Sequence, residues 1–173
     1  MQGLYIHIPF CVRKCGYCDF YSEVASEADM ARFLAALEHE LNQRAKQFTP
    51  LSPTTIFFGG GTPTRLSATN LRTLGQIIHR HVDTSHVIEW TSEINPGTID
   101  AAKAAALAEM GVNRASFGVQ DFDAAVQKAV HRVQPLEQVA VLMQAARDLG
   151  FASTNVDLIY GLPLQTPDRK SVV

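Results

Sequence analysis

The strongest constraint on the fold is a regular alternation of β-rich runs and helical segments along the chain. Five runs are predicted as strands, and the first four are each followed by a segment with apolar residues at helical spacing. The runs cover residues 3–8, 54–58, 87–94, 114–119 and 152–159. Parallel strands require such crossovers, so the pattern predicts an α/β fold with a parallel sheet. Right-handed crossovers would place an active site at the carboxyl ends of the strands.

Local capping signals predict where several helices begin and end. Ser26 and Ser67 each precede an apolar-periodic segment and are predicted N-caps. Thr98 or Asp100 begins an alanine-rich helix, and Gly111 ends it. Further helices are predicted near residues 123–130 and 135–149.

The composition is that of a globular chain without a dominant charge. The 173 residues are 46% apolar and 18% charged, which is enough apolar material for one folded domain. The net charge of −2 predicts no binding to nucleic acid or to an anionic membrane. No apolar run approaches the length of a membrane span, and the N-terminus lacks the features of a signal peptide. We therefore expect a cytoplasmic protein.

The three cysteines, Cys11, Cys15 and Cys18, lie in one predicted loop directly after the first strand. They are odd in number and too closely spaced for a disulfide framework, which favours metal binding in a reducing compartment. A [4Fe–4S] cluster normally takes four thiolates, so three would leave one iron with an open coordination position. The alternative is a zinc site of three cysteines and one histidine, such as His7. The position of the loop in a βα repeat favours the cluster.

Glycines or polar residues stand at the ends of the other predicted strands. Residues 59–62, Glu93, Gln120 and Asp157 each lie at or just beyond the end of a different strand. Because parallel strands bring their carboxyl ends to one edge, these residues are expected to converge near the cysteine loop. Glycines allow close approach to the backbone, and the polar side chains can accept hydrogen bonds from a ligand.

Several motifs in this order resemble one known family. They are Tyr-Ile-His-Ile-Pro-Phe at 5–10, the cysteine loop, Gly-Gly-Gly-Thr-Pro-Thr at 59–64, Glu-Ile-Asn-Pro-Gly-Thr at 93–98, Gly-Val-Gln-Asp-Phe at 118–122 and Asp-Leu-Ile-Tyr-Gly-Leu-Pro at 157–163. The chain thereby resembles the radical S-adenosylmethionine (SAM) enzymes, in the group that contains oxygen-independent coproporphyrinogen III oxidase and a haem chaperone. The resemblance implies a partial TIM-like (βα)6 barrel, with about five βα units present and an open parallel sheet.

The resemblance implies a [4Fe–4S] cluster on the three cysteines and one SAM molecule, or two. Reductive cleavage of SAM at the cluster would generate a 5′-deoxyadenosyl radical that abstracts hydrogen from the substrate. The implied SAM contacts are Tyr5, Tyr17, Gly60, Gly61, Thr62, Glu93, Gln120, Arg132 and Asp157. Arg132 is implied to bind the SAM carboxylate, and Tyr17 to shield the cluster or contact adenine. From the residues alone, Tyr5 could equally be a core aromatic, Tyr17 a surface aromatic and Arg132 a solvated charge.

Two functions fit this resemblance. The first is an oxidase that decarboxylates two propionate side chains of coproporphyrinogen III to vinyl groups, giving protoporphyrinogen IX, with a flavodoxin or ferredoxin as electron donor. The second is a haem chaperone that binds and delivers haem. Phe20 occupies the position where the oxidase pattern has a fourth cysteine, and the run at 95–98 looks more like the chaperone. The histidines at 39, 79, 81, 86 and 131 match no motif and are expected on the surface.

The expected domain organisation is an incomplete radical SAM core over residues 1–168, followed by a short tail at 169–173. Pro167 and Asp168 resemble the start of a sixth helix, while the sixth strand and the C-terminal domain of the family are not in this chain. A third alternative is therefore an inactive truncated product. A strand edge left open beside the site would shelter a radical poorly, so we expect SAM cleavage without formation of protoporphyrinogen IX.

Overall fold

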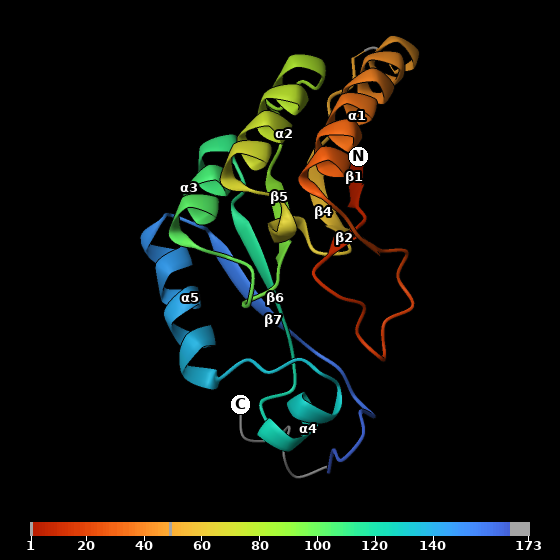
Figure 1. Ribbon diagram of the computed structural model, residues 1–173. Coiled ribbons are helices and arrows are strands. Elements are labelled where there is room, and N and C mark those ends of the chain that lie inside the picture. The colour runs from red at the N-terminus through yellow and green to blue at the C-terminus, as the bar shows by residue number, and fades with distance from the viewer. Residues whose placement is uncertain (1, 49, 167–173) are drawn as a thin grey trace.

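The computed structural model describes residues 2–48 and 50–166 and contains a five-stranded parallel sheet (Figure 1). In spatial order the strands are β1 (Gly3–Ile8), β4 (Thr55–Gly60), β5 (Glu89–Ile94), β6 (Arg114–Gln120) and β7 (Ser153–Leu158). Each strand pairs in parallel with its neighbours, and β1 and β7 form the two edges among the described residues. The predicted α/β fold with an open parallel sheet is confirmed.

Helical crossovers connect the strands and lie in a row along the sheet (Figure 1). The four longer helices are α1 (Glu27–Gln47), α2 (Ala68–His81), α3 (Ala101–Met110) and α5 (Leu136–Asp148). Two shorter ones are η1 (Pro63–Arg65) and α4 (Ala124–Ala129). None of the helices in the described part of the chain combines the length and apolar character that crossing a membrane would require.

The N-caps predicted at Ser26 and Ser67 are present, and each forms a hydrogen bond with a residue three positions along the chain. The Ser26 hydroxyl accepts from the Asp29 backbone N–H in a reciprocal capping box, and the Ser67 hydroxyl accepts from the Asn70 backbone N–H at the start of α2. Asp100, and not Thr98, is the N-cap of α3. Gly111 ends α3 with a φ of 107°, a left-handed conformation that favours glycine.

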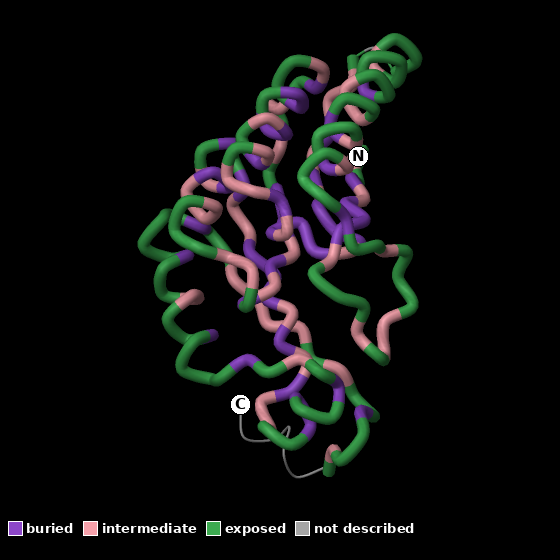
Figure 2. Tube along the Cα trace, in the orientation of Figure 1, coloured by how far each residue is buried: buried purple, intermediate pink, exposed green. Residues whose placement is uncertain are grey.

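The two faces of the sheet differ in polarity because side chains alternate along each strand. On one face, Ile8, Phe58 and Phe117 are almost fully buried and form one core with apolar side chains of the helices. Figure 2 shows buried stretches along the strands and exposed stretches along the helices. On the other face, the strand register aligns Glu93 with Ser116, and Ser116 with Asn155. The polar face is the one that carries the candidate site.

Two features of the strands differ from the sequence prediction. β4 extends through Gly59 and Gly60, which were expected in a loop, because these glycines pair with the last residues of β1. Two short strands, β2 (Phe10–Cys11) and β3 (Glu23–Val24), were not predicted and pair with each other at the ends of the cysteine loop. The predicted domain boundary after residue 168 lies outside the described residues.

Candidate functional site

A cavity of about 810 Å³ lies between the cysteine loop and the carboxyl ends of β4, β5, β6 and β7. All the predicted site residues except Tyr5 line it. They are Cys11, Cys15, Tyr17, Cys18, Gly60, Gly61, Thr62, Glu93, Gln120, Arg132 and Asp157. The expected convergence of strand ends around the cysteine loop is therefore present, whereas the role of each residue in binding SAM stays a prediction.

The cysteine loop presents three free, half-buried thiols to this cavity. A hydrogen bond from the Cys18 backbone N–H to the Cys15 carbonyl tightens the loop (N to O 3.1 Å). Cys11 Sγ lies 3.5 Å from the Thr62 hydroxyl, which joins the loop to the end of β4. Three thiols on one cavity wall fit a [4Fe–4S] cluster held by Cys11, Cys15 and Cys18, which would supply the electron for SAM cleavage when bound.

His7, the candidate fourth ligand of a zinc site, points elsewhere. Its Nε2 lies 2.9 Å from the Tyr21 carbonyl oxygen and its Nδ1 lies 3.2 Å from the Tyr5 hydroxyl. His7 is also absent from the lining of the cavity. Across residues 2–48 and 50–166, no three His, Cys, Asp or Glu side chains, the three cysteines included, are gathered tightly enough to hold a metal ion, so the fit of the cysteines to a cluster rests on their residue type and on the cavity that they share.

Gly60, the last residue of β4, and Gly61 after it must be glycines because neighbouring atoms leave no room for a Cβ. Gly60 has a φ of 104°, and a Cβ there would lie 2.6 Å from the His7 ring. A Cβ on Gly61 would lie 2.8 Å from the Phe10 carbonyl oxygen. The backbone N–H groups of Gly61 and Thr62 donate to the carbonyls of Ile8 and Phe10. The glycines thus let the β4 loop pack directly against the start of the cysteine loop.

Arg132 lies in the loop between α4 and α5. Its Nη2 donates to the Gly118 carbonyl (2.6 Å), and its Nη1 lies 4.0 Å from Cys15 Sγ. The buried Gln127 side chain holds this loop through hydrogen bonds with the backbone N–H and carbonyl of Gln134 (both 2.8 Å). A Cβ on Gly118 would lie 2.9 Å from Arg132 Nη2, so glycine makes room for the guanidinium.

Two carboxylates face the cavity from neighbouring parts of the sheet. Asp157 accepts hydrogen bonds from the Ser116 hydroxyl (2.7 Å) and the Asn155 amide (2.9 Å). Burial and the charge of Asp157 raise the pKa of Glu93 to about 7, against a hydrogen bond from the Gly60 backbone. Such a pair favours a ligand that brings a positive charge or hydrogen-bond donors.

Two lining residues have left-handed backbone conformations that are uncommon outside glycine. Gln120 has a φ of 75° at a register shift in the pairing of β6 with β7. His131 has a φ of 56°, and its carbonyl accepts a hydrogen bond from Arg13. His131 is exposed, as expected, but it also lines the cavity, as does Arg13. Neither His131 nor Arg13 was predicted as a site residue, because no local sequence signal marks them.

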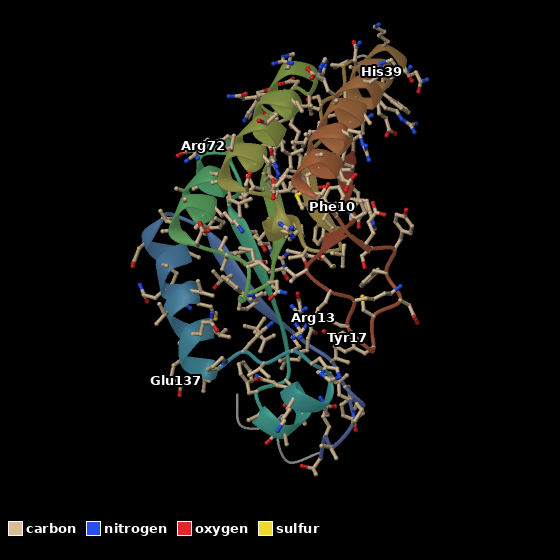
Figure 3. All side chains as sticks on the ribbon, viewed as in Figure 1. Phe10, Arg13, Tyr17, His39, Arg72 and Glu137 are labelled. Atoms are coloured by element: carbon tan, nitrogen blue, oxygen red, sulfur yellow. The ribbon has the colours of Figure 1, made fainter. Side chains whose placement is uncertain are left out.

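The two predicted tyrosines lie in different places. Tyr17 lines the cavity and packs against a small apolar cluster of Val126, Val130 and Leu162. Burial raises the pKa of Tyr17 to about 12, although Arg132 opposes the rise. Figure 3 shows Tyr17 and Arg13 in the region of the cysteine loop. Tyr5 is 55% exposed, contacts the Phe57 ring and lines a separate groove beside α1.

Comparisons with known proteins identify the family of this chain. The model of the radical SAM superfamily matches residues 5–172. Oxygen-independent coproporphyrinogen III oxidase of Salmonella typhimurium is 40% identical over 96% of this chain, and the heme chaperone HemW of Bacillus subtilis is 42% identical over 96%. The chain spans 36% and 44% of the length of these relatives.

A solved structure extends the comparison to the fold. Coproporphyrinogen III oxidase (HemN) from Escherichia coli, described as a radical SAM enzyme, superposes with a TM-score of 0.90 at 37% identity, over 98% of this chain and 39% of that one. The chain therefore belongs to the radical SAM superfamily, within which it is similar to coproporphyrinogen III oxidases and the heme chaperone HemW.

Proposed function

We propose that this chain is the cofactor-binding core of an oxygen-independent coproporphyrinogen III oxidase. The observation that supports this proposal most strongly is that a loop with three cysteines, an arginine and two carboxylates line one cavity. The similarity to oxidases along nearly the whole chain supports the same substrate. Each of two propionate groups would lose one hydrogen atom to the 5′-deoxyadenosyl radical, and then CO2 together with one electron that passes to a one-electron acceptor, leaving a vinyl group. The electron donor would be a flavodoxin or ferredoxin, and the location the cytoplasm.

The proposed residue roles follow the charges around the cavity. Cys11, Cys15 and Cys18 would hold a [4Fe–4S] cluster. Arg132 would pair with the SAM carboxylate through charge-assisted hydrogen bonds. Glu93 would accept from the SAM amino group, whose positive charge offsets the cost of ionising this carboxyl group.

The remaining proposed contacts serve the adenosyl part of SAM. Gln120 and Asp157 would accept hydrogen bonds from ribose hydroxyls or the amino group. The Gly60 and Gly61 backbone and Thr62 would form the wall beside the methionyl group. Tyr17 would exclude water from the cluster. Tyr5 would contact SAM only if its exposed ring turned towards the cavity, so this assignment has the least geometric support.

The second candidate is a haem chaperone on the same scaffold. Phe20 lines the cavity and is 64% exposed, at the position where the oxidase pattern carries a fourth cysteine. An apolar side chain at the mouth favours contact with a flat apolar ring more than covalent chemistry. The similarity to a heme chaperone points in the same direction.

One anaerobic experiment separates the two candidates. The reconstituted protein is incubated with SAM, a reductant and coproporphyrinogen III, and nucleosides and porphyrins are separated by chromatography. A parallel titration with haem is followed by absorbance, and Cys15→Ala serves as the inactive control. Vinyl products support the oxidase, and stoichiometric haem binding without vinyl products supports the chaperone. Formation of 5′-deoxyadenosine with neither outcome would support the expectation from the sequence that this chain cleaves SAM without forming protoporphyrinogen IX.

A further inference from the structure

Lys103, in the first turn of α3, holds a positive charge where its surroundings disfavour one. Burial lowers the pKa of Lys103, Asp100 opposes this shift, and Arg65 lowers the pKa further. The amino end of a helix also favours negative charge over positive charge. The helix does not need this ammonium group, because the Asp100 side chain already caps it by accepting from the Lys103 backbone N–H (2.8 Å).

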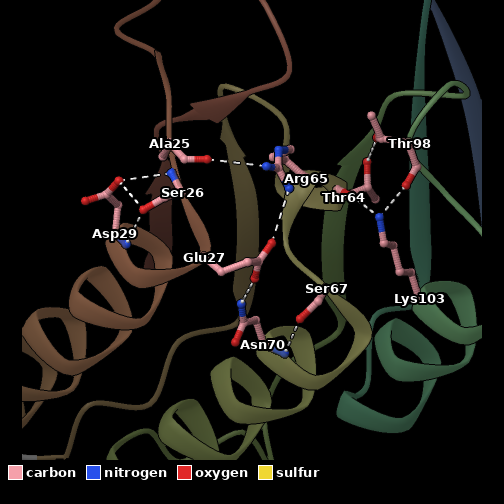
Figure 4. A network of polar contacts seen from close by, with 10 residues as sticks. All are labelled: Ala25, Ser26, Glu27, Asp29, Thr64, Arg65, Ser67, Asn70, Thr98 and Lys103. Atoms are coloured by element: carbon pink, nitrogen blue, oxygen red, sulfur yellow. Dashed lines mark hydrogen bonds and ion pairs between the residues drawn. The ribbon is translucent and has the colours of Figure 1, made fainter.

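The ammonium group instead joins two loops (Figure 4). Lys103 Nζ donates to the Thr64 carbonyl at 2.9 Å and to the Thr98 carbonyl at 2.7 Å. The hydroxyl groups of these two threonines lie 2.6 Å apart, and the Asn95 backbone N–H donates to the Thr64 hydroxyl (3.3 Å). The lysine therefore completes a closed set of contacts between the segment after β4 and the segment after β5.

Both segments form walls of the cavity. Residues 60–63 line it after β4, and residues 93–95 with Gly97 and Thr98 line it at the end of β5. Lys103 is not among the residues that line the cavity, so it contacts these walls on the side that faces away from the cavity. On the far side of η1, Arg65 donates to the Ala25 carbonyl (3.3 Å) and pairs with Glu27 (3.5 Å). The β4 segment is thus attached both to the start of α1 and to α3.

We propose that Lys103 is a positioning residue that sets the separation of the two cavity walls contributed by the loops after β4 and β5. This inference rests on the proposed SAM site, because those walls carry Gly60, Gly61 and Glu93. An ammonium group can donate to two carbonyls at once, which an apolar side chain of the same length cannot do. Without it, the two carbonyls lose their shared donor and the loops are free to move apart.

The test compares Lys103→Met with a matched control, Arg72→Met. Arg72 lies on α2 and pairs with Glu109 of α3 (Nε to Oε2 2.8 Å), and both side chains are exposed. In calorimetric titrations of the cluster-loaded protein, Lys103→Met should bind SAM about tenfold more weakly than the parent. This is the lower end of the loss expected when a residue that only supports the lining of a site is removed. Arg72→Met should leave the SAM affinity unchanged. Lys103→Arg, which can still donate to both carbonyls, should recover part of the affinity.

A second measurement needs no cofactor. Amide hydrogen exchange should accelerate in Lys103→Met at residues 62–66 and 95–98, while the amides of β5 and β6 keep the exchange rates of the parent chain. Equal SAM affinity in Lys103→Met and the parent would overturn the proposal. Faster exchange throughout the chain would also overturn it, because it would indicate a general loss of stability. If the parent itself fails to bind SAM, the proposed function fails, and the exchange data still decide whether Lys103 holds the loops.

Discussion

The Arg132 guanidinium lies 4.0 Å from the Cys15 sulfur (Nη1 to Sγ), although 117 positions separate the two residues in the sequence. The same guanidinium lines the cavity. One side chain can therefore serve both the cluster loop and an anionic ligand group.

Arg132→Ala should weaken SAM binding at least about tenfold, because a lost charge-assisted hydrogen bond costs about 1.5–3 kcal/mol. The measurement is a calorimetric titration of the reconstituted protein with SAM. Arg147→Ala, which removes an exposed arginine at the end of α5, is the control and should bind as the parent does. Unchanged affinity in Arg132→Ala would refute the proposed carboxylate contact. Asp157→Ala should weaken binding in the same assay through loss of its acceptor oxygens.

Anaerobic reconstitution with iron and sulfide should give a brown protein with about four irons per chain. Cys15→Ala should abolish the chromophore, because it removes one of three thiolates. His7→Ala should retain it, since both ring nitrogens of His7 face Tyr5 and Tyr21. Metal analysis and absorbance spectra check both results. Stoichiometric zinc uptake without iron would contradict the cluster assignment.

Glu93→Gln should stabilise the cofactor-free chain at about pH 8 but not at about pH 4.5. The pKa of Glu93 is about 7 in the fold against an ordinary value of 4.5, so between these values the folded state binds the proton more tightly than the unfolded state. Stability contributed by this group is therefore lost as the pH rises from about 4.5 to about 7. The glutamine variant avoids that loss and should gain about 1–2 kcal/mol at the higher pH, after allowance for solvent screening.

The check is thermal or denaturant unfolding of both proteins across this pH range. The difference in unfolding free energy between variant and parent should grow with pH and level off above about pH 7. A constant difference would show that the Glu93 carboxyl group titrates normally. The same variant should bind SAM more weakly, because the carboxylate that accepts from the amino group is gone.

Gly60→Ala should destabilise the chain by more than about 1 kcal/mol, because its φ of 104° disfavours a side chain and the new Cβ would meet the His7 ring at 2.6 Å. Gly16→Ala is a matched control in the cysteine loop, where a Cβ would meet nothing within 4 Å. Denaturant unfolding of the cofactor-free proteins measures both. Similar stability of Gly60→Ala and the parent would show that the β4 loop is not closely packed against β1.

Features that depend on neighbouring residues could be predicted from the amino-acid sequence. Ser26 and Ser67 cap their helices through bonds that span three residues, so both caps can be predicted from the chain, whereas Asp100 was one of two candidates beside Thr98. The alternation of strands and helices predicts the parallel sheet, since a helical crossover is the usual way to connect parallel strands. The spacing of the three cysteines likewise predicts one metal-binding loop without knowledge of the fold.

The contacts between segments that are distant in the sequence could not be predicted in this way. The left-handed backbone of Gln120 arises where β6 shifts register against β7, and no local signal predicts it. Arg132 reaches Cys15 because the buried Gln127 holds its loop, and Lys103 joins two walls that are 34 residues apart at Thr64 and Thr98. Such contacts form only when the core brings separate βα units together, because their free energy comes from packing and burial that neighbouring residues do not provide.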